Sequence, residues 1–475
     1  MTVTSEPARV VVAGAASGVG KTTVIVALAR ALRARGLRVA LFKCGPDYLD
    51  PTYHARAAAG PSYNLDGWLM GRDAVRATFA DAARGHDVAL VEGMMGLFDG
   101  ASPASDEGST AEVAKWLDAP VLLVADASGM ARSIAALAAG YAAFDPALRV
   151  AGVIANRIGG RGHLDLLRRA LARPPIVGGL PGDPALAFPE RHLGLVRADE
   201  RSVPEELLAA WGERASEWID LDVVLRIARS APALAVGSGT RTGASGAPAS
   251  GRAAGAPRPR ARIAVASDEA LHFYYPDNLR RLEAAGAELV PFSPLRDRAL
   301  PDTDGVLLGG GYPEAHAEAL AANERLRRAI AEHAAAGGPI YAECGGLMLL
   351  ARRLRTLDGR EHEMVGVLPC DVAMRDRLQA IGYVEVETRR RTILGPPGLR
   401  FRGHQFRHSE LVGEAVAEPA YLVREPRGDA RCVEGFALGS VVASYVHAHW
   451  ASNPRIPEEL VSACAARRAR TGAAR

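Results

Sequence analysis

Short apolar runs rich in β-branched residues recur through the first half of the chain, and helix-length segments separate them. The runs cover residues 9–13, 39–43, 87–92, 121–126 and 150–156. A continuous apolar run suits a strand that is buried on both faces, and parallel strands need a long crossover between them. The pattern therefore predicts an α/β domain built on a parallel sheet.

The same pattern restarts after a segment of different composition. Residues 230–260 consist mostly of Gly, Ala, Ser, Pro and Arg, which cannot bury enough apolar surface to offset the entropy of ordering. Apolar runs then return at 262–267, 287–292, 305–308, 339–341 and 381–386. The 475 residues also exceed the roughly 250–300 at which a single core stops growing. We therefore predict two α/β domains, 1–229 and 261–475, joined by a flexible linker at 230–260.

Charge and cysteine usage exclude several classes of partner. The 57 Lys and Arg nearly balance the 54 Asp and Glu, so no basic stripe indicates a nucleic acid. No stretch approaches the roughly 20 apolar residues that span a bilayer, and no apolar signal segment follows Met1. The five cysteines are scattered, which is typical of a reducing compartment. We expect a soluble cytoplasmic protein with small-molecule partners, without nucleic acid or membrane.

A glycine-rich turn lies between the first predicted strand and a helix. The run contains Gly18, Gly20, Lys21, Thr22 and Thr23, in the strand, loop and helix context that a P-loop requires. Backbone N–H groups would hold phosphates, the lysine would reach the β- and γ-phosphates, and the first threonine would ligate Mg²⁺. We expect these five residues to bind ATP; a packing turn without a ligand is the alternative.

The spacing of this turn departs from the usual P-loop. The strict pattern places its first glycine at Ala15, whereas the glycine here is Gly14. This longer form is similar to the dethiobiotin-synthetase-like branch of P-loop proteins. In that branch a position related to Asn156 recognises the adenine edge, and a turn residue is the alternative for Asn156.

Charged side chains follow the next two predicted strands. The second strand leads into Lys43, Asp47 and Asp50, and the third ends at Glu92 in the position of a Walker-B acid. Open α/β folds bind ligands at this carboxyl edge of the sheet. A single acid in a turn is more often a cap, but acids on successive strand ends predict a Mg²⁺ and phosphate site.

A lone cysteine occupies a sharp turn in the second half. Cys344 follows the apolar run 339–342 and precedes two glycines and a run that we expect to be an amphipathic helix. This is a nucleophile elbow with Cys in place of Ser, and the helix N-terminus is expected to lower the thiol pKa. A lone cysteine is otherwise a small buried apolar residue.

A thiol nucleophile needs a base and an oxyanion site. His447 and His449 share one face of a strand-like segment, and either could be the base. In the run 307–314, Gly310 can supply one oxyanion N–H, and Gly345 the other. A structural glycine turn is the alternative reading of this run.

Taken in order, the motifs of this chain resemble one family along roughly residues 10–450. They are SGVGKTT, FKCGPDYLDP, NLDGW, VEGMMGLFDG, LGGGYPE, YAECGGLML, GHQFRHS and SYVHAHW. The chain resembles the cobyrinic acid and hydrogenobyrinic acid a,c-diamide synthases, in which a dethiobiotin-synthetase-like P-loop domain is fused to a class I glutamine amidotransferase domain. It departs from that family at Gln405, where Glu is expected, and in the long linker.

The resemblance implies a glutamine-hydrolysing carbon–nitrogen ligase of cobalamin biosynthesis. Glutamine would be hydrolysed at Cys344, and ammonia would amidate carboxylates a and c of a corrin through acyl phosphates made with ATP and Mg²⁺. It favours His447 as base, although the Glu common two residues later is replaced by His449. Further implied roles are catalysis by Asp47, Asp50 and Glu92, metal binding by Thr22, Asp47 and Glu92, and corrin positioning by Tyr48 and Leu49.

Other functions are also compatible with some of these motifs. The same chemistry could act on another tetrapyrrole acid, such as a nickel sirohydrochlorin. A partitioning-type ATPase switch would carry a second lysine where Ala16 stands, and a dead scaffold would have lost Lys21 or Cys344. The order of amidation and the oligomeric state are not encoded in these motifs; a homodimer is one assembly that they allow.

Overall fold

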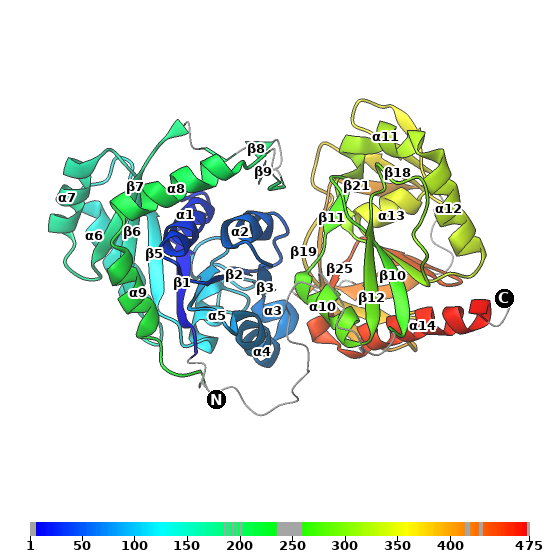
Figure 1. Cartoon of the computed structure of the whole chain (residues 1–475), viewed down its shortest axis with the longest axis horizontal. Coiled ribbons are helices and arrows are strands. Elements are labelled where there is room, and N and C mark those ends of the chain that lie inside the picture. The colour runs from blue at the N-terminus through cyan, green and yellow to red at the C-terminus, as the bar shows by residue number, and fades with distance from the viewer. Residues whose placement is uncertain are drawn as a thin grey trace. The chain divides into compact units, whose positions relative to one another are not determined.

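In the computed structural model the chain divides into two units. The structure describes residues 6–234 apart from 185–186, 189, 192–193, 196 and 200–201, and then 259–413, 419–426 and 431–472. The units divide between Arg241 and Thr242, and we call them unit 1 and unit 2 (Figure 1). Most of the predicted linker, residues 235–258, lies outside the described residues.

Unit 1 contains the predicted parallel sheet. Its strand order is β3-β2-β4-β1-β5-β6-β7, and all neighbouring pairs are parallel. The strands are β1 (Ala8–Gly14), β2 (Val39–Cys44), β3 (Tyr63–Leu65), β4 (Val88–Glu92), β5 (Val121–Asp126), β6 (Val150–Ile158) and β7 (Ile176–Pro181), and a separate pair is formed by β8 (Glu190–Arg191) and β9 (Gly194–Leu195). The helices are α1 (Lys21–Ala34), α2 (Asp50–Ala58), α3 (Gly67–Met70), α4 (Arg72–Ala83), α5 (Thr110–Trp116), α6 (Ser133–Phe144), α7 (Arg161–Ala170), α8 (Glu205–Trp218) and α9 (Leu221–Arg229).

The five strands expected in this half are confirmed within one or two residues, but the prediction missed β3 and β7. The first has only three residues, and the second contains Gly178 and Gly179. A Cβ at Gly178 would lie 2.5 Å from the backbone of Ile219, so a residue with low strand propensity stands where two chain segments meet closely.

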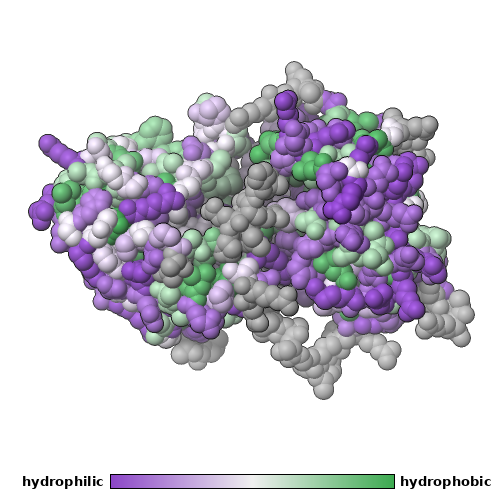
Figure 2. Space-filling model, turned by 90° about the horizontal axis from the view of Figure 1, so that it is seen from above, coloured by the Kyte–Doolittle hydropathy of each residue, from purple (hydrophilic) through white to green (hydrophobic). Residues whose placement is uncertain are grey.

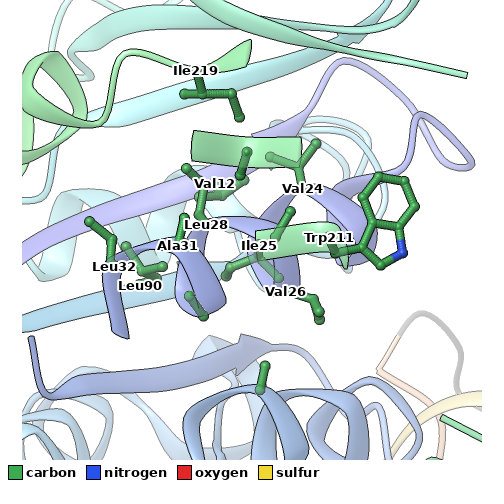
Figure 3. Packing of buried hydrophobic residues seen from close by; sticks show 14 of the residues in the cluster. Val12, Val24, Ile25, Val26, Leu28, Ala31, Leu32, Leu90, Trp211 and Ile219 are labelled. Atoms are coloured by element: carbon green, nitrogen blue, oxygen red, sulfur yellow. The ribbon is translucent and has the colours of Figure 1, made fainter. Parts of the chain in front are cut away.

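Both faces of this sheet are covered by helices. Ile154 of β6 belongs to a core shared with α1, α2, α8 and α9, whereas its neighbours Val153 and Ala155 pack against α6 and α7. Figure 3 shows Leu28 of α1 among the buried residues of the first core. The continuous apolar strands of the sequence follow from this double coverage.

Unit 2 is built on a larger, mixed sheet. Its order is β12-β10-β13-β15-β24-β23-β22-β19-β20-β25, parallel from β12 to β24 and antiparallel beyond. These strands are β10 (Ala261–Ala266), β12 (Ala287–Phe292), β13 (Gly305–Leu308), β15 (Ile340–Glu343), β19 (Ala380–Thr388), β20 (Arg400–Arg407), β22 (Pro419–Arg424), β23 (Arg431–Leu438), β24 (Val441–Ser444) and β25 (His447–His449). Smaller sheets pair β11 (Leu271–Phe273) with β14 (Gly310–Gly311), and join β16 (Arg353–Arg355), β17 (Glu361–Glu363), β18 (Asp371–Met374) and β21 (Ser409–Val412).

The helices of unit 2 flank this sheet. They are α10 (Pro276–Ala284), η2 (Pro313–His316), α11 (Ala317–Ala322), α12 (Glu324–Ala335), α13 (Gly345–Leu350), η3 (Trp450–Ser452) and α14 (Arg455–Gly472). Every residue of α13 is buried, so the expectation of an amphipathic helix after the cysteine is wrong. The six-residue helix lies within the core, where no polar face is needed.

The large sheet of unit 2 folds back on itself. Although β15 and β25 are far apart in the strand order, the Ala448 N–H of β25 donates a 3.0 Å hydrogen bond to the carboxylate of Glu343, the last residue of β15. Asn278 of α10 fixes β25 from the other side by bonding to Ala448 and Trp450. This return of the sheet brings two distant sequence segments to one place.

On the face seen in Figure 2, hydrophobic residues form separate patches among hydrophilic ones. Within the described part of the chain, no helix is both long enough and apolar enough to cross a bilayer.

Truncating the fully buried Leu28 tests the core of unit 1. Leu28→Ala is expected to lower the free energy of unfolding by about 2–5 kcal/mol, because the cavity adds to the lost transfer energy. Leu166, in α7, is 40% exposed, and Leu166→Ala should cost less than about 1 kcal/mol. Urea denaturation followed by tryptophan fluorescence reports mainly on unit 1, which holds Trp68, Trp116, Trp211 and Trp218. Equal losses for the two variants would contradict this packing.

Candidate functional site

The glycine-rich turn of unit 1 folds around Lys21. Gly18 and Gly20 have φ of 75° and 87°, in the left-handed region that favours glycine. The Lys21 ammonium donates to the carbonyls of Ala16 at 3.1 Å and Met95 at 2.7 Å. A Cβ at Gly14 would lie 2.9 Å from that ammonium nitrogen and 2.8 Å from the Ala16 carbonyl oxygen, so a larger residue would crowd the turn at this position.

Next to this turn, the carboxylate of Glu92 contacts three side chains. Its Oε1 accepts hydrogen bonds from the Thr22 hydroxyl at 2.8 Å and the Lys43 ammonium at 2.9 Å, and its Oε2 lies 2.5 Å from His54 Nε2. Lys43 also pairs with Asp50 at 2.5 Å. The structure thus brings together four of the predicted residues, Thr22, Lys43, Asp50 and Glu92.

Burial and charge pairing oppose each other in this cluster. Burial alone would raise the pKa of Glu92, but Lys43 and His54 hold it well below its ordinary value. Burial would lower the pKa of Lys43, but Asp50 and Glu92 raise it well above its ordinary value. Burial, with Lys43 nearby, lowers the pKa of Lys21 to about 8. The charges of Glu92 and Lys43 are thus retained by their mutual pairing, whereas burial, with Asp47 nearby, raises the pKa of Asp50.

Asp47 has a structural part in the turn after β2. Its Oδ1 accepts from the backbone N–H groups of Leu49 at 2.7 Å and Asp50 at 2.8 Å, which sets the start of α2. Asn64 holds the same turn by donating to the carbonyl of Asp47 at 2.8 Å. Tyr48 and Leu49 lie half-buried in this turn, beside the charged cluster.

Sequence reasoning missed His54, which is fully buried between Glu92 and the hydroxyl of Ser62, 3.0 Å away. A signal was present, because Asp50 and His54 are four residues apart on α2 and therefore share one helix face. His54 occupies one oxygen of Glu92 and so fixes the orientation of that carboxylate.

Asn156 lies within β6, and its side chain contacts the turn. Its amide donates to the carbonyl of Val19 at 2.8 Å. The following residue, Arg157, has φ of 57° and donates to the carbonyl of Gly18 at 2.9 Å. Both side chains brace the P-loop, and the second was not predicted. Thr23 follows on α1 and is half-buried.

The oxygen donors of this site suit Mg²⁺. Among the described residues, no three His, Cys, Asp or Glu side chains form a metal cage. Mg²⁺ does not need one, because it keeps waters and phosphate oxygens and takes one or two carboxylates from the protein. The hydroxyl of Thr22 beside Glu92, with Asp47 in the adjoining turn, fits that requirement.

Gly20→Ala tests the bracing of the P-loop. A Cβ at Gly20 would lie 2.2 Å from the Asn156 amide nitrogen, and we expect the displaced loop to lose at least about tenfold in affinity for a fluorescent ATP analogue. Gly36, with φ of 80°, has nothing within 4 Å of its Cβ position. Gly36→Ala should cost only the left-handed strain, about 1–2 kcal/mol of stability, with affinity unchanged. Equal affinities of the two variants would contradict the clash.

In unit 2, Cys344 occupies the predicted sharp turn between β15 and α13. Its φ is 48°, a strained value for a residue with a side chain, and its N–H donates to the Ser444 carbonyl at 2.7 Å. The expectation of a lowered thiol pKa is wrong for this arrangement. Burial raises the pKa of Cys344 to about 12, and Glu314 adds to the effect, against one hydrogen bond from Gly345. The thiol therefore needs a base.

The histidines of β25 have different surroundings. A Cβ at Gly310 would lie 2.4 Å from Cε1 of His447, so this imidazole lies directly against the predicted oxyanion strand. His449 instead packs on the ring of Tyr275, 4.7 Å away. Burial, with His404 nearby, lowers the pKa of His447 to about 3, so the imidazole is neutral at rest and its protonated form needs a neighbouring negative charge to stabilise it.

The glycines of the two predicted oxyanion segments meet. A Cβ at Gly345 would lie 2.9 Å from the backbone nitrogen of Gly311. Gly311 was not among the predicted donors, since the sequence favoured Gly310, the residue that contacts His447. Glu343 was also missed: its Oε2 lies 3.8 Å from Nδ1 of His447. An acid at the end of a buried strand was the available signal.

Comparisons with known proteins find one family model for each unit. A model described as the CobQ/CobB/MinD/ParA nucleotide binding domain matches residues 10–196, and one described as the CobB/CobQ-like glutamine amidotransferase domain matches 262–455. The cobyrinate a,c-diamide synthase of Leptospira interrogans serovar copenhageni is 48% identical over 458 residues, covering 96% of this chain and 98% of the relative.

Two further relatives align over similar lengths. The cobyrinate a,c-diamide synthase of Syntrophotalea carbinolica is 47% identical over 463 residues, covering 96% of this chain and 98% of the relative. The hydrogenobyrinate a,c-diamide synthase of Streptomyces coelicolor is 42% identical over 481 residues, covering 96% and 97%. The chain belongs to the cobyrinate and hydrogenobyrinate a,c-diamide synthase family, whose members are glutamine-dependent ligases.

Proposed function

We propose that this enzyme amidates carboxylates a and c of cobyrinic or hydrogenobyrinic acid, using ATP and glutamine, through acyl phosphates. The observation that carries the proposal is the presence of two complementary sites in one chain. Unit 1 has a P-loop above the buried cluster of Glu92 and Lys43, and unit 2 has a strained cysteine with His447 nearby. Full-length similarity to the named relatives supports the substrate class.

In unit 1 the chemistry is activation of a carboxylate. A carboxylate is a poor acyl donor, so one of its oxygens attacks the γ-phosphorus of ATP, ADP leaves, and an acyl phosphate forms. Ammonia then attacks the carbonyl carbon, phosphate leaves, and the amide remains. The backbone of Gly18 and Gly20 and the ammonium of Lys21 hold the phosphates, and Asn156 lies at the adenine side.

The remaining charged residues of unit 1 have positioning roles. Thr22, Asp47 and Glu92 would hold Mg²⁺, which would neutralise charge on the transferring phosphoryl group. Lys43 and Asp50 form the charged wall beside the reacting oxygens, and the turn at Tyr48 and Leu49 faces the corrin. Fixed charges of this kind stabilise a transition state because they need no reorganisation.

In unit 2 the chemistry is hydrolysis of glutamine. His447 accepts the Cys344 proton as the sulfur attacks the side-chain carbonyl, and the N–H groups of Gly345 and the 310–311 strand hold the oxyanion. The imidazolium returns the proton to the leaving nitrogen, which departs as ammonia. Water then hydrolyses the thioester with the same histidine as base, and glutamate is released.

Cellular setting and assembly complete the proposal. We place the enzyme in the cytoplasm, where ATP and glutamine are available. Size-exclusion chromatography with light scattering will tell whether it acts as a monomer or as the homodimer that the sequence allows.

Cys344→Ser separates the two half-reactions. With MgATP and either ring acid, the wild type should add two amides from glutamine, read as product mass. The variant should lose glutamine-dependent amidation by about 1,000-fold or more, because the serine hydroxyl is a far weaker nucleophile, and should retain synthesis from free ammonia. The ring converted at the lower concentration identifies the substrate. Amidation of neither ring, with ATP hydrolysis intact, would overturn the corrin assignment.

Glu92→Gln should give the opposite result. The neutral amide removes the charge that holds Lys43 and the metal, so synthesis should fall by about 100-fold or more with either nitrogen source. Glutamine hydrolysis in unit 2 should persist. Normal ammonia-dependent synthesis by this variant would remove Glu92 from the proposed site.

A further inference from the structure

A buried carboxyl group lies directly beside the proposed base. Glu343 ends β15, immediately before the nucleophile, and is only 6% exposed. Its Oε1 accepts hydrogen bonds from the Tyr341 hydroxyl at 2.7 Å and the Ala448 N–H at 3.0 Å. Those bonds hold the carboxyl group in place. The other oxygen, Oε2, lies 3.8 Å from Nδ1 of His447.

The other titratable groups that face Glu343 are tyrosines and the Cys344 thiol. Tyr341, Tyr274 and Tyr421 surround the carboxyl group, and burial raises the pKa of each tyrosine above its ordinary value, so they stay neutral. Within the described residues, the only basic side chain within 4 Å of the Glu343 carboxylate is His447, and the two form an ion pair only when the imidazole is protonated. A buried carboxylate is costly unless it is hydrogen-bonded or paired with a cation.

In the class of enzymes that this unit resembles, a glutamate commonly lies two residues after the base, and here that position is His449. His449, two residues after His447, packs against Tyr275 and receives the Ala451 N–H at 3.3 Å. Nothing in this arrangement turns His449 toward the base. The carboxyl group beside the base comes instead from β15, because the sheet folds back and brings β25 to it.

We propose that Glu343 is the positioning residue that orients His447 and stabilises its imidazolium during glutamine hydrolysis. The inference rests on the proposed glutaminase function. Because Nδ1 faces Glu343, Nε2 is the ring nitrogen that takes the Cys344 proton. The positive charge formed in that step lies next to the carboxylate, and the proton later leaves from Nε2 to the departing nitrogen, so Glu343 itself exchanges no proton.

The protonation of Glu343 gives the reaction a pH signature. Burial raises the pKa of Glu343 to about 7, so its charge is present above that pH and is lost below it. Glu314 and Arg407 are the other charged groups that act on the thiol, and the charge of Glu343 itself raises the pKa of the isolated thiol. Transfer of the Cys344 proton to His447 should therefore become easier as the pH rises through about 7, because the imidazolium that forms then lies beside a charged carboxylate.

Glu343→Gln in the full-length enzyme tests the proposal. The variant should lower kcat for glutamine hydrolysis by about 100-fold while KM changes less than about threefold, since the base is misoriented but glutamine still binds. Alkylation of Cys344 by iodoacetamide, followed by mass spectrometry across pH, should lose its rise near 7 and increase only where the thiol itself ionises. Synthesis from free ammonia should be unchanged.

Glu434→Gln is the matched control. Glu434 is another carboxyl group, half-buried, and it accepts hydrogen bonds from the Ser444 hydroxyl and, at 2.7 Å, the Tyr445 N–H, but among the described residues it makes no contact with the His447 imidazole like that of Glu343. Its replacement should leave kcat and the pH dependence of alkylation within about twofold of the wild type.

Each outcome has a distinct meaning. A Glu343→Gln enzyme with wild-type kcat and an unchanged alkylation profile overturns the proposal, whereas a wild type that does not hydrolyse glutamine overturns the proposed function instead. If Glu343→Gln does not fold, Tyr341→Phe keeps the charge and removes one hydrogen bond that fixes it. That variant should lower kcat by about fivefold, and an unchanged kcat would contradict the positioning role.

Discussion

In both units the polar groups of the proposed site lie at the carboxyl ends of parallel strands. A strand buried on two faces can carry polar groups only where it stops, and neighbouring parallel strands stop at the same edge. In unit 1, β1, β2 and β4 lead into the P-loop, Lys43 and Glu92. In unit 2, β13 and β15 lead into the 310–311 strand and Cys344, and β24 leads to His447. Both proposed sites are therefore built in the same way, from residues at the ends of neighbouring parallel strands.

The buried groups of the two sites differ in their ionisation states. Unit 1 keeps ionised groups under the P-loop by pairing them, so that Lys43 holds the pKa of Glu92 down despite complete burial. Unit 2 keeps its groups neutral, because burial raises the pKa of Cys344 and lowers that of His447. Phosphoryl transfer needs fixed charges before it begins, whereas thiol attack creates a charge pair during the step. Neutral resting groups also protect the thiol from oxidation.

Local sequence patterns predicted the parts of the molecule that local structure builds. The P-loop and the cysteine turn are each a strand, a tight turn and a helix, so consecutive residues suffice to identify them. The same holds for Lys43 and Glu92, which mark strand ends. Strands β3 and β7 were missed because one is very short and the other is rich in glycine.

Other parts depend on contacts between distant segments, and no local pattern encodes them. His54 reaches Glu92 only because α2 packs against β2, the neighbour of β4, and Arg157 reaches the P-loop only because β6 lies two strands from β1. Glu343 meets His447 because the sheet of unit 2 curls back. The thiol pKa was misjudged for a related reason: the sequence indicates a helix N-terminus, but burial of the whole turn outweighs it.

Transfer of isotopically labelled nitrogen tests most directly the claim that one chain couples both sites. The enzyme would be given MgATP, the preferred ring acid and glutamine labelled with ¹⁵N in its side-chain amide, at a concentration matched by unlabelled ammonium. If glutamine hydrolysis in unit 2 feeds synthesis in unit 1, both new amides will carry predominantly ¹⁵N, and Cys344→Ser will yield only unlabelled amides. Product with unlabelled amides from the wild-type enzyme would contradict the coupling and leave unit 2 without its proposed role.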